Sequence, residues 1–339
     1  MTGLERTLRF LQGERVDFPP FHPIIMRWAA KYAGVKYSKF CTDPSAKCNA
    51  MILCADDFGI DWVTVMSDPW AEASAFGIQV EYPEDNLPLD TGGHYPDAIS
   101  ASVVKHYNPL ENSRCLNRLT EIREFRKQVG DKLFIVGWVE GPIAEYVDLR
   151  QASNAAVDLL LEPEAVEKSL DIIIECAMEF IHLQVKAGAH CIGIGDAFCS
   201  QIGPELYQHF AFTRQRKLVE HIHSEGAIAK LHICGNTESI LDRMILTGAD
   251  IIDIDHMVPS LGNFVSLLEQ NQVFSGKSDP VSIIQDGTLE TIIQSARSHF
   301  KQANGRCITS AGCEITPGTS NDNMRTFKRA AETMFINFQ

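Results

Sequence analysis

The chain has 339 residues, of which 45% are hydrophobic and 22% are charged. This composition belongs to a folded chain with a substantial core, and it excludes disordered, collagen-like and mini-protein classes. The 44 acidic and 30 basic side chains give a formal net charge of -14. Such a charge disfavours nucleic acid or an anionic membrane as the main partner, so we expect neither.

The sequence also predicts a cellular location. No apolar stretch approaches the ~18 to 20 residues of a membrane-spanning helix. Residues 1–11 mix Glu5, Arg6 and Arg9 with apolar residues, unlike the core of a signal peptide. The ten cysteines are scattered rather than arranged as in a small secreted domain. We therefore expect a cytoplasmic chain with reduced thiols, some of them available as metal ligands.

Short β-branched or apolar runs alternate along the chain with stretches of helical periodicity. This alternation, without a series of consecutive hairpins, predicts a parallel sheet. The predicted strands are Phe21–Ile25, Trp62–Met66, Leu133–Val139, Cys191–Ile194, Ile228–Ile233, Ile251–Ile254, Val273–Ser275 and Cys307–Ser310. The predicted helices are Pro44–Phe58, Leu116–Val129, Pro163–Ala187, Pro204–Ser224, Thr237–Leu246, Phe264–Gln270, Thr288–Gln302 and Met324–Ile336.

Eight strand–helix units favour an α/β fold of the (β/α)8 TIM-barrel type. The alternative is an open doubly wound sheet, but no G-x-G-x-x-G turn follows the first predicted strand. We predict one barrel domain over residues 1–339. Residues 68–112 interrupt the repeat, because they are rich in Pro, Gly and Asp and contain only a weak strand at 78–82. We interpret 68–112 as an insertion over the barrel mouth, either a lid, a docking surface or a structural flap.

Polar residues follow most of the predicted strands. Because the C-terminal ends of barrel strands converge on one mouth, residues far apart in sequence meet there. The residues expected at this mouth are His22, Ser67, Asp68, Glu140, Asp196, His232, Cys234, Asp255, His256, Asp279, Cys313 and Glu314.

The sharpest feature at this mouth is the pair His232 and Cys234. Alternation along a strand places both on one face, where an imidazole and a thiolate form half of a tetrahedral zinc site. Cys313, after the eighth predicted strand, supplies a second thiolate. The alternative is a buried His and Cys whose polar atoms are satisfied by their neighbours. The fourth position falls to Asp255, His256, Glu314, water or substrate, and Asp255 is equally a candidate to orient His232.

Other mouth residues are candidates for catalysis, namely Asp68 and Asp255, and for substrate binding. Asp68 is a candidate general base or hydrogen-bond acceptor, with capping or salt bridging as the alternative. Arg27 is a candidate for binding a substrate anion such as a sulfonate or carboxylate, unless it pairs with an acidic neighbour. The remaining candidate substrate contacts, for which a structural role is the alternative, are Glu140, Asp196 and Asp279.

Several motifs resemble the uroporphyrinogen decarboxylase superfamily over nearly the whole chain, which implies a (β/α)8 barrel. They are Arg27, Gly59-Ile60-Asp61 leading to Ser67-Asp68, Gly141-Pro142, and Gly276-x-x-Asp279-Pro280. The sequence departs from the decarboxylases in reading Arg27-Trp28-Ala29-Ala30-Lys31 where they have two arginines for substrate carboxylates. Asp68 matches their catalytic aspartate, but their C-terminal histidine has no counterpart in residues 330–339.

Leu231-His232-Ile233-Cys234-Gly235 together with Cys313 resembles the corrinoid-dependent methyltransferase branch of that superfamily. The resemblance implies catalytic zinc on His232, Cys234 and Cys313. It also implies transfer of a methyl group between a corrinoid protein and a small molecule, either a thiol such as coenzyme M or a methoxylated substrate. No cobalamin-binding motif stands out in the chain, so we expect the corrinoid to arrive on a partner protein.

Two other functions remain as alternatives. A cofactor-free decarboxylase of the porphyrinogen type would need no metal and would ignore chelators. A non-catalytic corrinoid-binding or zinc-binding protein would hold metal without transferring a methyl group. The direction of transfer and the oligomeric state are left open by the sequence.

Overall fold

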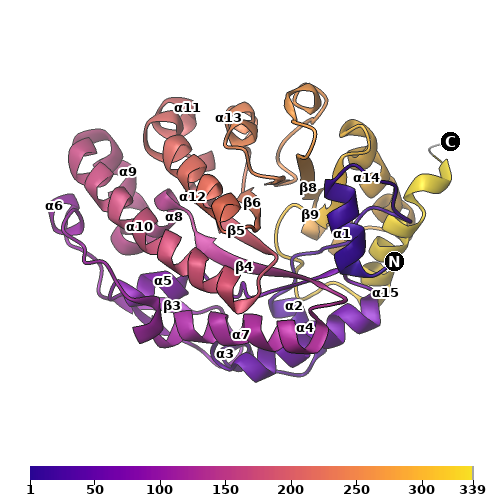
Figure 1. Cartoon of the computed structure of the whole chain (residues 1–339), viewed down its shortest axis with the longest axis horizontal. Helices are drawn as coiled ribbons and strands as arrows, with labels where there is room; N and C mark the ends of the chain where they lie inside the picture. Colours follow the sequence, from indigo (N-terminus) through magenta and orange to yellow (C-terminus); the bar gives the residue numbers. More distant parts are fainter. Residues whose placement is uncertain (338–339) are drawn as a thin grey trace.

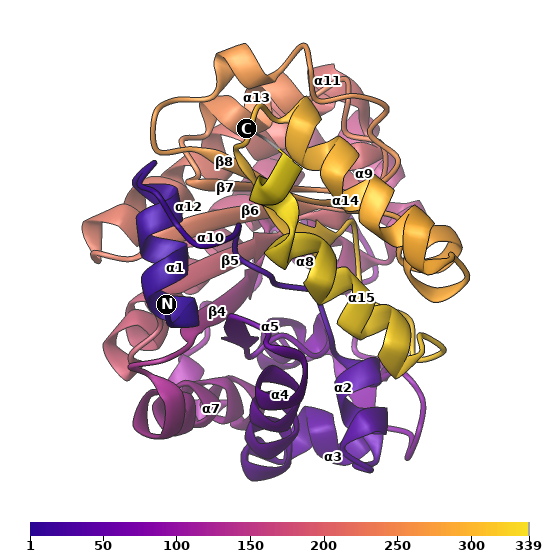
Figure 2. The same ribbon diagram turned by 90° about the vertical axis from the view of Figure 1, so that its right-hand side faces the viewer.

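The computed structural model describes residues 1–337. A seven-stranded parallel sheet curls through the molecule with helices around its outside (Figure 1), as the turned view also shows (Figure 2). The strands follow the order β1-β4-β5-β6-β7-β8-β9, which confirms the predicted α/β barrel fold. Their bounds are β1 (Trp62–Thr64), β4 (Phe134–Glu140), β5 (Cys191–Gly195), β6 (Ile228–Ile233), β7 (Ile251–Ile254), β8 (Val273–Ser278) and β9 (Cys307–Ala311).

The helices that alternate with these strands confirm most of the predicted ones. None of the helices in residues 1–337 is both long and apolar enough to cross a membrane. Their bounds are α1 (Gly3–Leu11), α2 (Arg27–Tyr32), α3 (Tyr37–Thr42), α4 (Pro44–Phe58), α5 (Trp70–Ala75), α6 (Ala98–Ala101), α7 (Ser113–Val129), α8 (Pro142–Arg150), α9 (Ala152–Leu161), α10 (Pro163–Ala187), α11 (Gly203–Leu206), α12 (Thr213–Ser224), α13 (Leu241–Leu246), α14 (Leu289–Gln302) and α15 (Asn321–Glu332).

The prediction of a regular strand at Phe21–Ile25 is wrong. Only Phe21 pairs, through a single parallel bridge to Thr309 of β9, and its carbonyl oxygen accepts a hydrogen bond of 3.0 Å from the Asp61 N–H. Pro20 and Pro23 flank this residue and have no N–H to give to a ladder. The short segment nevertheless lies between β9 and the start of β1, where the eighth strand of the barrel belongs.

Other predicted helices also differ from the structure, and the predicted helix Thr237–Leu246 is helical only over Leu241–Leu246. The stretch Phe264–Gln270 forms only a 3-10 turn, Val265–Leu267, because seven residues are too few to bury an apolar stripe. The predicted Pro204–Ser224 helix is divided into α11, a π-helical segment at Tyr207–Phe212, and α12.

Residues 68–112 hold small elements of their own. Besides α5 and α6 they form an antiparallel hairpin of β2 (Gln79–Glu81) and β3 (Leu89–Gly92), where the sequence predicted one weak strand. Helix α5 packs on α7 and α8, and α6 packs on α10. The insertion is therefore anchored to the outer helices, and its role as a lid stays a prediction.

The pairing register of the parallel strands places four residues in one row. Glu140 of β4 pairs with Gly195 of β5, which pairs with His232 of β6, which in turn pairs with Asp253 of β7. Side chains in register on neighbouring parallel strands point to the same face of the sheet. This row therefore brings polar groups from four strands to one level of the barrel.

Candidate metal centre

Three side chains meet at the C-terminal ends of β6 and β9. The Nε2 atom of His232 lies 3.0 Å from the Sγ atom of Cys234, and that sulfur lies 3.6 Å from the Sγ atom of Cys313. One ligand atom from each residue lies within 4.8 Å of the other two. The structure thus brings together the three residues that the sequence singled out as metal ligands.

The backbone explains how residues 79 positions apart come so close. His232 lies within β6 and Cys234 directly after it, so both face the same side of the sheet, as strand alternation requires. Cys313 follows Gly312 in the loop after β9. A Cβ atom on Gly312 would lie 2.3 Å from the backbone nitrogen of His256, so only glycine lets these two loops approach.

A carboxylate that the sequence analysis missed stands behind the histidine. An oxygen of Asp253 lies 2.8 Å from the Nδ1 atom of His232 and 2.8 Å from the Nζ atom of Lys230. Both Asp253 and Lys230 are buried. A carboxylate at the far ring nitrogen fixes the ring and leaves Nε2 to act as a ligand. The sequence did contain a signal for this carboxylate. Lys230 and Asp253 are charged residues inside the otherwise apolar strands β6 and β7, on the same face of the sheet as His232.

The protonation of the three side chains reflects their contacts. Burial alone would lower the pKa of His232, but its hydrogen bonds to Asp253 and Cys313 raise that pKa to about 9. Hydrogen bonding from Cys234 and the nearby imidazole lower the pKa of the Cys313 thiol against the effect of burial. The same sulfur–sulfur contact, together with burial, raises the pKa of Cys234. A metal ion that takes all three ligands must therefore displace protons from His232 and Cys234.

Within residues 1–337 this cluster contains no fourth histidine, cysteine or acidic residue at the same mutual distance. Asp255 accepts a hydrogen bond of 2.9 Å from the N–H of Gly235, beside Cys234, and its other oxygen lies 2.5 Å from His256 Nδ1. The prediction that Asp255 orients His232 is therefore wrong, because Asp253 is the carboxylate beside that ring. His256 lies between Asp255 and Asp279.

Glu314 and Arg27 lie next to the cluster as a pair. One Glu314 oxygen accepts a hydrogen bond of 2.9 Å from the backbone N–H of Arg27 and lies 3.5 Å from the guanidinium Nε. This is the acidic neighbour that the sequence analysis gave as the alternative for Arg27. About a third of the Arg27 side chain (35%) stays exposed, so it still has surface for a ligand.

Asp68 lies in a network of charges under the insertion. Its Oδ2 atom accepts hydrogen bonds of 2.6 Å from Arg114 and 2.7 Å from the hydroxyl of Ser67, and 1% of its side chain is exposed. Burial would raise its pKa, but Arg114 and Arg118 outweigh burial and lower it. Asp68 is therefore an ionised, ion-paired carboxylate, which is the alternative that the sequence analysis gave for it.

The three predicted substrate contacts differ from one another. Asp196 is fully buried and accepts hydrogen bonds of 2.7 Å from the N–H of Ala144 and from Gln215, while burial raises its pKa to about 6. Asp279 caps the helical segment after β8 by accepting bonds from the N–H groups of residues 281 and 282. Glu140 is half-buried, and one of its oxygens accepts a hydrogen bond of 2.8 Å from the indole N–H of Trp138.

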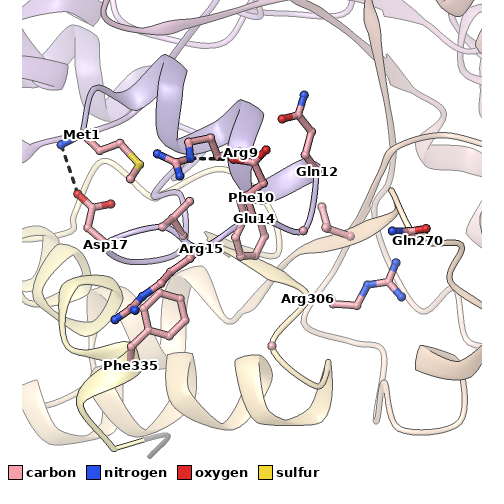
Figure 3. A pocket seen from close by; sticks show the side chains of 14 residues that line it. Met1, Arg9, Phe10, Gln12, Glu14, Arg15, Asp17, Gln270, Arg306 and Phe335 are labelled. Carbon is pink, nitrogen blue, oxygen red and sulfur yellow. Dashed lines mark hydrogen bonds and ion pairs between the residues drawn. The ribbon is translucent and has the colours of Figure 1, made fainter.

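A pocket of about 1020 Å³ lies at the other end of the barrel, near the starts of β8 and β9 (Figure 3). Met1, Arg9, Arg15, Arg306 and Phe335 are among its lining residues. Within its wall the N-terminal amino group of Met1 pairs with Asp17, and Arg9 pairs with Glu14. In barrel enzymes the N-terminal end serves stability and the C-terminal end chemistry, so the three-ligand cluster is the candidate site.

Comparisons with known proteins place the chain in a family. The family model for uroporphyrinogen decarboxylase (URO-D) matches residues 2–334. The chain is 29% identical to a uroporphyrinogen decarboxylase from Prochlorococcus marinus (strain MIT 9211), with 96% of each chain covered. It is 27% identical to the enzyme of the same name from Synechococcus sp. (strain CC9605), with 98% of this chain and 97% of the relative covered.

Solved structures show the same fold. A methyltransferase from Methanosarcina mazei superposes with a TM-score of 0.89 at 22% identity, over 99% of each chain. A B12-independent methionine synthase from Shewanella sp. W3-18-1 superposes with a TM-score of 0.56 at 14% identity, over 87% of this chain and 89% of the other. With a family model that covers nearly its whole length, the chain belongs to the uroporphyrinogen decarboxylase family of enzymes.

Proposed function

We propose that this protein is a zinc-dependent methyltransferase that moves a methyl group between a corrinoid protein and a small molecule. One observation carries the proposal: an imidazole nitrogen and two thiol sulfurs, from β6 and from the loop after β9, lie within 4.8 Å of one another. One nitrogen and two sulfur ligands suit zinc, and three protein ligands leave a fourth position for a reactant.

The residues present fit a zinc ion in their chemistry as well as in their spacing. Asp253 holds the far nitrogen of the His232 ring, so that Nε2 faces the two sulfurs. The lowered pKa of Cys313 makes one thiolate available before any metal binds. When bound, zinc would supply Lewis acidity, either lowering the pKa of a thiol acceptor or polarising the oxygen of a methoxylated donor.

The corrinoid and the second substrate come from outside the chain in this proposal. The methyl acceptor or donor is a thiol such as coenzyme M or a methoxylated or methylated compound. Arg27, beside Cys313 through its pairing with Glu314, is the residue we assign to an anionic group on that molecule. Asp255 and Asp279 lie at the same end of the barrel, where their carboxylates are 2.5 and 3.7 Å from the two ring nitrogens of His256.

A cofactor-free decarboxylase is the second candidate, because the curated relatives at 27–29% identity carry that name. The contacts of Asp68 argue against it here. A catalytic carboxylate must reach its substrate, whereas this one is ion-paired with Arg114 and 1% exposed. A decarboxylase would also gain nothing from the three zinc-type ligands and would work in the presence of chelators.

The test uses the zinc-loaded full chain with methylcob(III)alamin and a panel of thiols, folates and methoxyaromatics. We expect the cobalt absorption spectrum to report demethylation with at least one acceptor, and we expect one zinc per chain. Cys234→Ala should lose both zinc and transfer, since two ligands do not make a tight site. The control is Cys307→Ala, which removes a buried thiol at the start of β9 and should keep both.

Two results would contradict the proposal. Methyl transfer that survives in Cys234→Ala, or in the presence of a chelator that strips the metal, would show that the cluster is not the reacting site. Inertness with every acceptor, together with decarboxylation of a porphyrinogen by the metal-free chain, would favour the second candidate.

A further inference from the structure

Cys234 and Cys313 differ from the other cysteines of the chain in exposure. The sequence has ten cysteines, and all of them are free thiols in the structure. These two are half-buried, whereas the remaining eight are buried: Cys41, Cys48, Cys54, Cys115, Cys176, Cys191, Cys199 and Cys307. A small reactive molecule from solvent therefore meets Cys234 and Cys313 before any other thiol of the chain.

The sulfur atoms of these two cysteines are also in contact. Their Sγ atoms lie 3.6 Å apart, and among residues 1–337 no other two cysteine side chains share a hydrogen bond. A disulfide bond is about 2.05 Å long, so the two atoms need to approach by roughly 1.5 Å. Both cysteines lie in loops, one directly after β6 and the other after β9. A side-chain shift of that size there leaves the hydrogen bonds of the sheet intact.

The fold holds these two loops on a common support. Gly235, next to Cys234, donates a backbone hydrogen bond of 2.9 Å to the carboxylate of Asp255. Gly312, next to Cys313, packs so closely on the same segment that a Cβ atom there would lie 2.3 Å from the backbone nitrogen of His256. Both loops therefore rest on residues 255–256, and these contacts within the protein are enough to bring the two sulfurs together.

From this geometry we propose that Cys234 and Cys313 are a site of reversible oxidation, where a hydroperoxide converts the two thiols of the metal-free chain into a disulfide bond. The inference goes beyond the proposed function, with which it shares two side chains. It makes oxidation and metal binding mutually exclusive, because a thiolate is a zinc ligand and a disulfide sulfur is not. Of the three ligands only His232 would remain, which is too few to hold zinc.

The oxidation takes place in two balanced steps. One sulfur attacks an oxygen of the hydroperoxide, the O–O bond breaks, and the products are a sulfenic acid and an alcohol, or water where the oxidant is hydrogen peroxide. The second sulfur then attacks the first, the S–O bond breaks, and water leaves. In total the two thiols give up two electrons and two protons, and the peroxide takes up both. A dithiol reductant restores the thiols through a mixed disulfide.

The experiment treats the full chain with hydrogen peroxide, once after a chelator has removed metal and once in the presence of zinc. We expect the metal-free chain to lose two of its ten free thiols and the mass of two hydrogen atoms, with peptide mapping linking Cys234 to Cys313. Free zinc at about ten times its Kd should slow this loss about 10-fold, because only the metal-free fraction reacts. A dithiol should restore all ten thiols and the binding of zinc.

Two variants distinguish this pair from thiol oxidation in general. Cys313→Ser removes one partner, so it should form no disulfide within the chain, and Cys234 should gain oxygen instead. Cys307→Ser removes a buried thiol at the start of β9 and should oxidise as the wild type does. The peptide map of the wild type tests the pair even where Cys313→Ser does not fold.

Several results would overturn this inference. They are a metal-free wild type that keeps all its thiols, one that gains oxygen atoms without a cross-link, and one that links other cysteines. Equal rates of oxidation with and without zinc would overturn the exclusion between oxidant and metal. Thiol counting and mapping require no turnover, so they are independent of whether the protein transfers methyl groups. Methyl transfer by a chain that never forms the disulfide would overturn this inference alone.

Discussion

The barrel mouth has two sides that treat polar groups in opposite ways. On the β1 and β4 side, buried acids and bases meet in pairs of opposite charge. Those pairs are Asp68 with Arg114, Glu72 with Arg118, and Lys47 with Glu121, at 2.6, 2.8 and 3.0 Å. The β6 to β9 side also holds one such pair, Lys230 with Asp253, but there the ligand atoms of His232, Cys234 and Cys313 face mainly one another.

This difference distinguishes charged side chains that stabilise the fold from side chains that are able to bind a metal ion or a substrate. A buried charge that is fully paired has little left to offer a substrate, and its removal mainly leaves the partner unpaired. The three converging ligand atoms, in contrast, direct their lone pairs at a common point, and Asp253 holds the His232 ring in that orientation. Burial and charge alone therefore do not identify a site in this fold, whereas the direction of unused ligand atoms does.

The largest effect we expect comes from breaking the paired side. Arg118→Met would leave Glu72 buried without its partner and would remove the hydrogen bond of 2.8 Å that Arg118 donates to the Asp68 carbonyl oxygen. We expect a loss of about 3 to 5 kcal/mol in the free energy of unfolding, measured by urea titration. Arg123→Met, at an exposed position on the same helix, should change it by less than about 0.5 kcal/mol. Loss of zinc from folded Arg118→Met would blur the distinction between the two sides.

A smaller effect tests the ligand side. Asp253→Asn keeps the shape of the residue beside His232 but removes the charge that orients the ring. We expect zinc affinity to fall by about 10-fold to 100-fold, measured by competition with a chromophoric chelator. Asp242→Asn, a surface change on α13, is the control and should leave the affinity as it is. Unchanged affinity in Asp253→Asn would mean that this carboxylate serves Lys230 alone.

Much of the fold could be predicted because it follows from local pattern. Helices α4 and α10 begin and end where the sequence places them, each with a proline at its first turn and a glycine after its end. Hydrophobicity alone does not show that the segment at Phe21 fails to form a regular strand. The segment pairs at one residue only, because the neighbouring prolines have no N–H to donate to an adjacent strand. The terminal residues Phe338 and Gln339 of the predicted domain lie outside the described residues.

The candidate site was predictable to the extent that strand ends converge in a barrel. That rule finds His232, Cys234 and Cys313, because each lies at or just beyond a strand end. It does not find Asp253, which lies inside β7 and reaches His232 through the pairing register. It also makes Asp68 look catalytic, because its partner Arg114 comes from a helix 46 residues away and no strand rule reports it.

The smallest effect we expect concerns Asp68 and has a defined pH dependence. Arg114 and Arg118 lower the pKa of Asp68 in the folded protein below the ordinary aspartate pKa of about 4. The ionised Asp68 therefore stabilises the fold fully above pH ~4. This stabilisation is lost as the pH falls through the pKa of Asp68 in the folded protein. Asp68→Asn should cost about 1.5 kcal/mol of unfolding free energy at pH 7, and the difference from wild type should vanish in acid. Urea titrations at several pH values measure this. Zinc content and methyl transfer should stay intact, because Asp68 belongs to the paired side; a variant that is stable but inactive would place chemistry on both sides of the mouth.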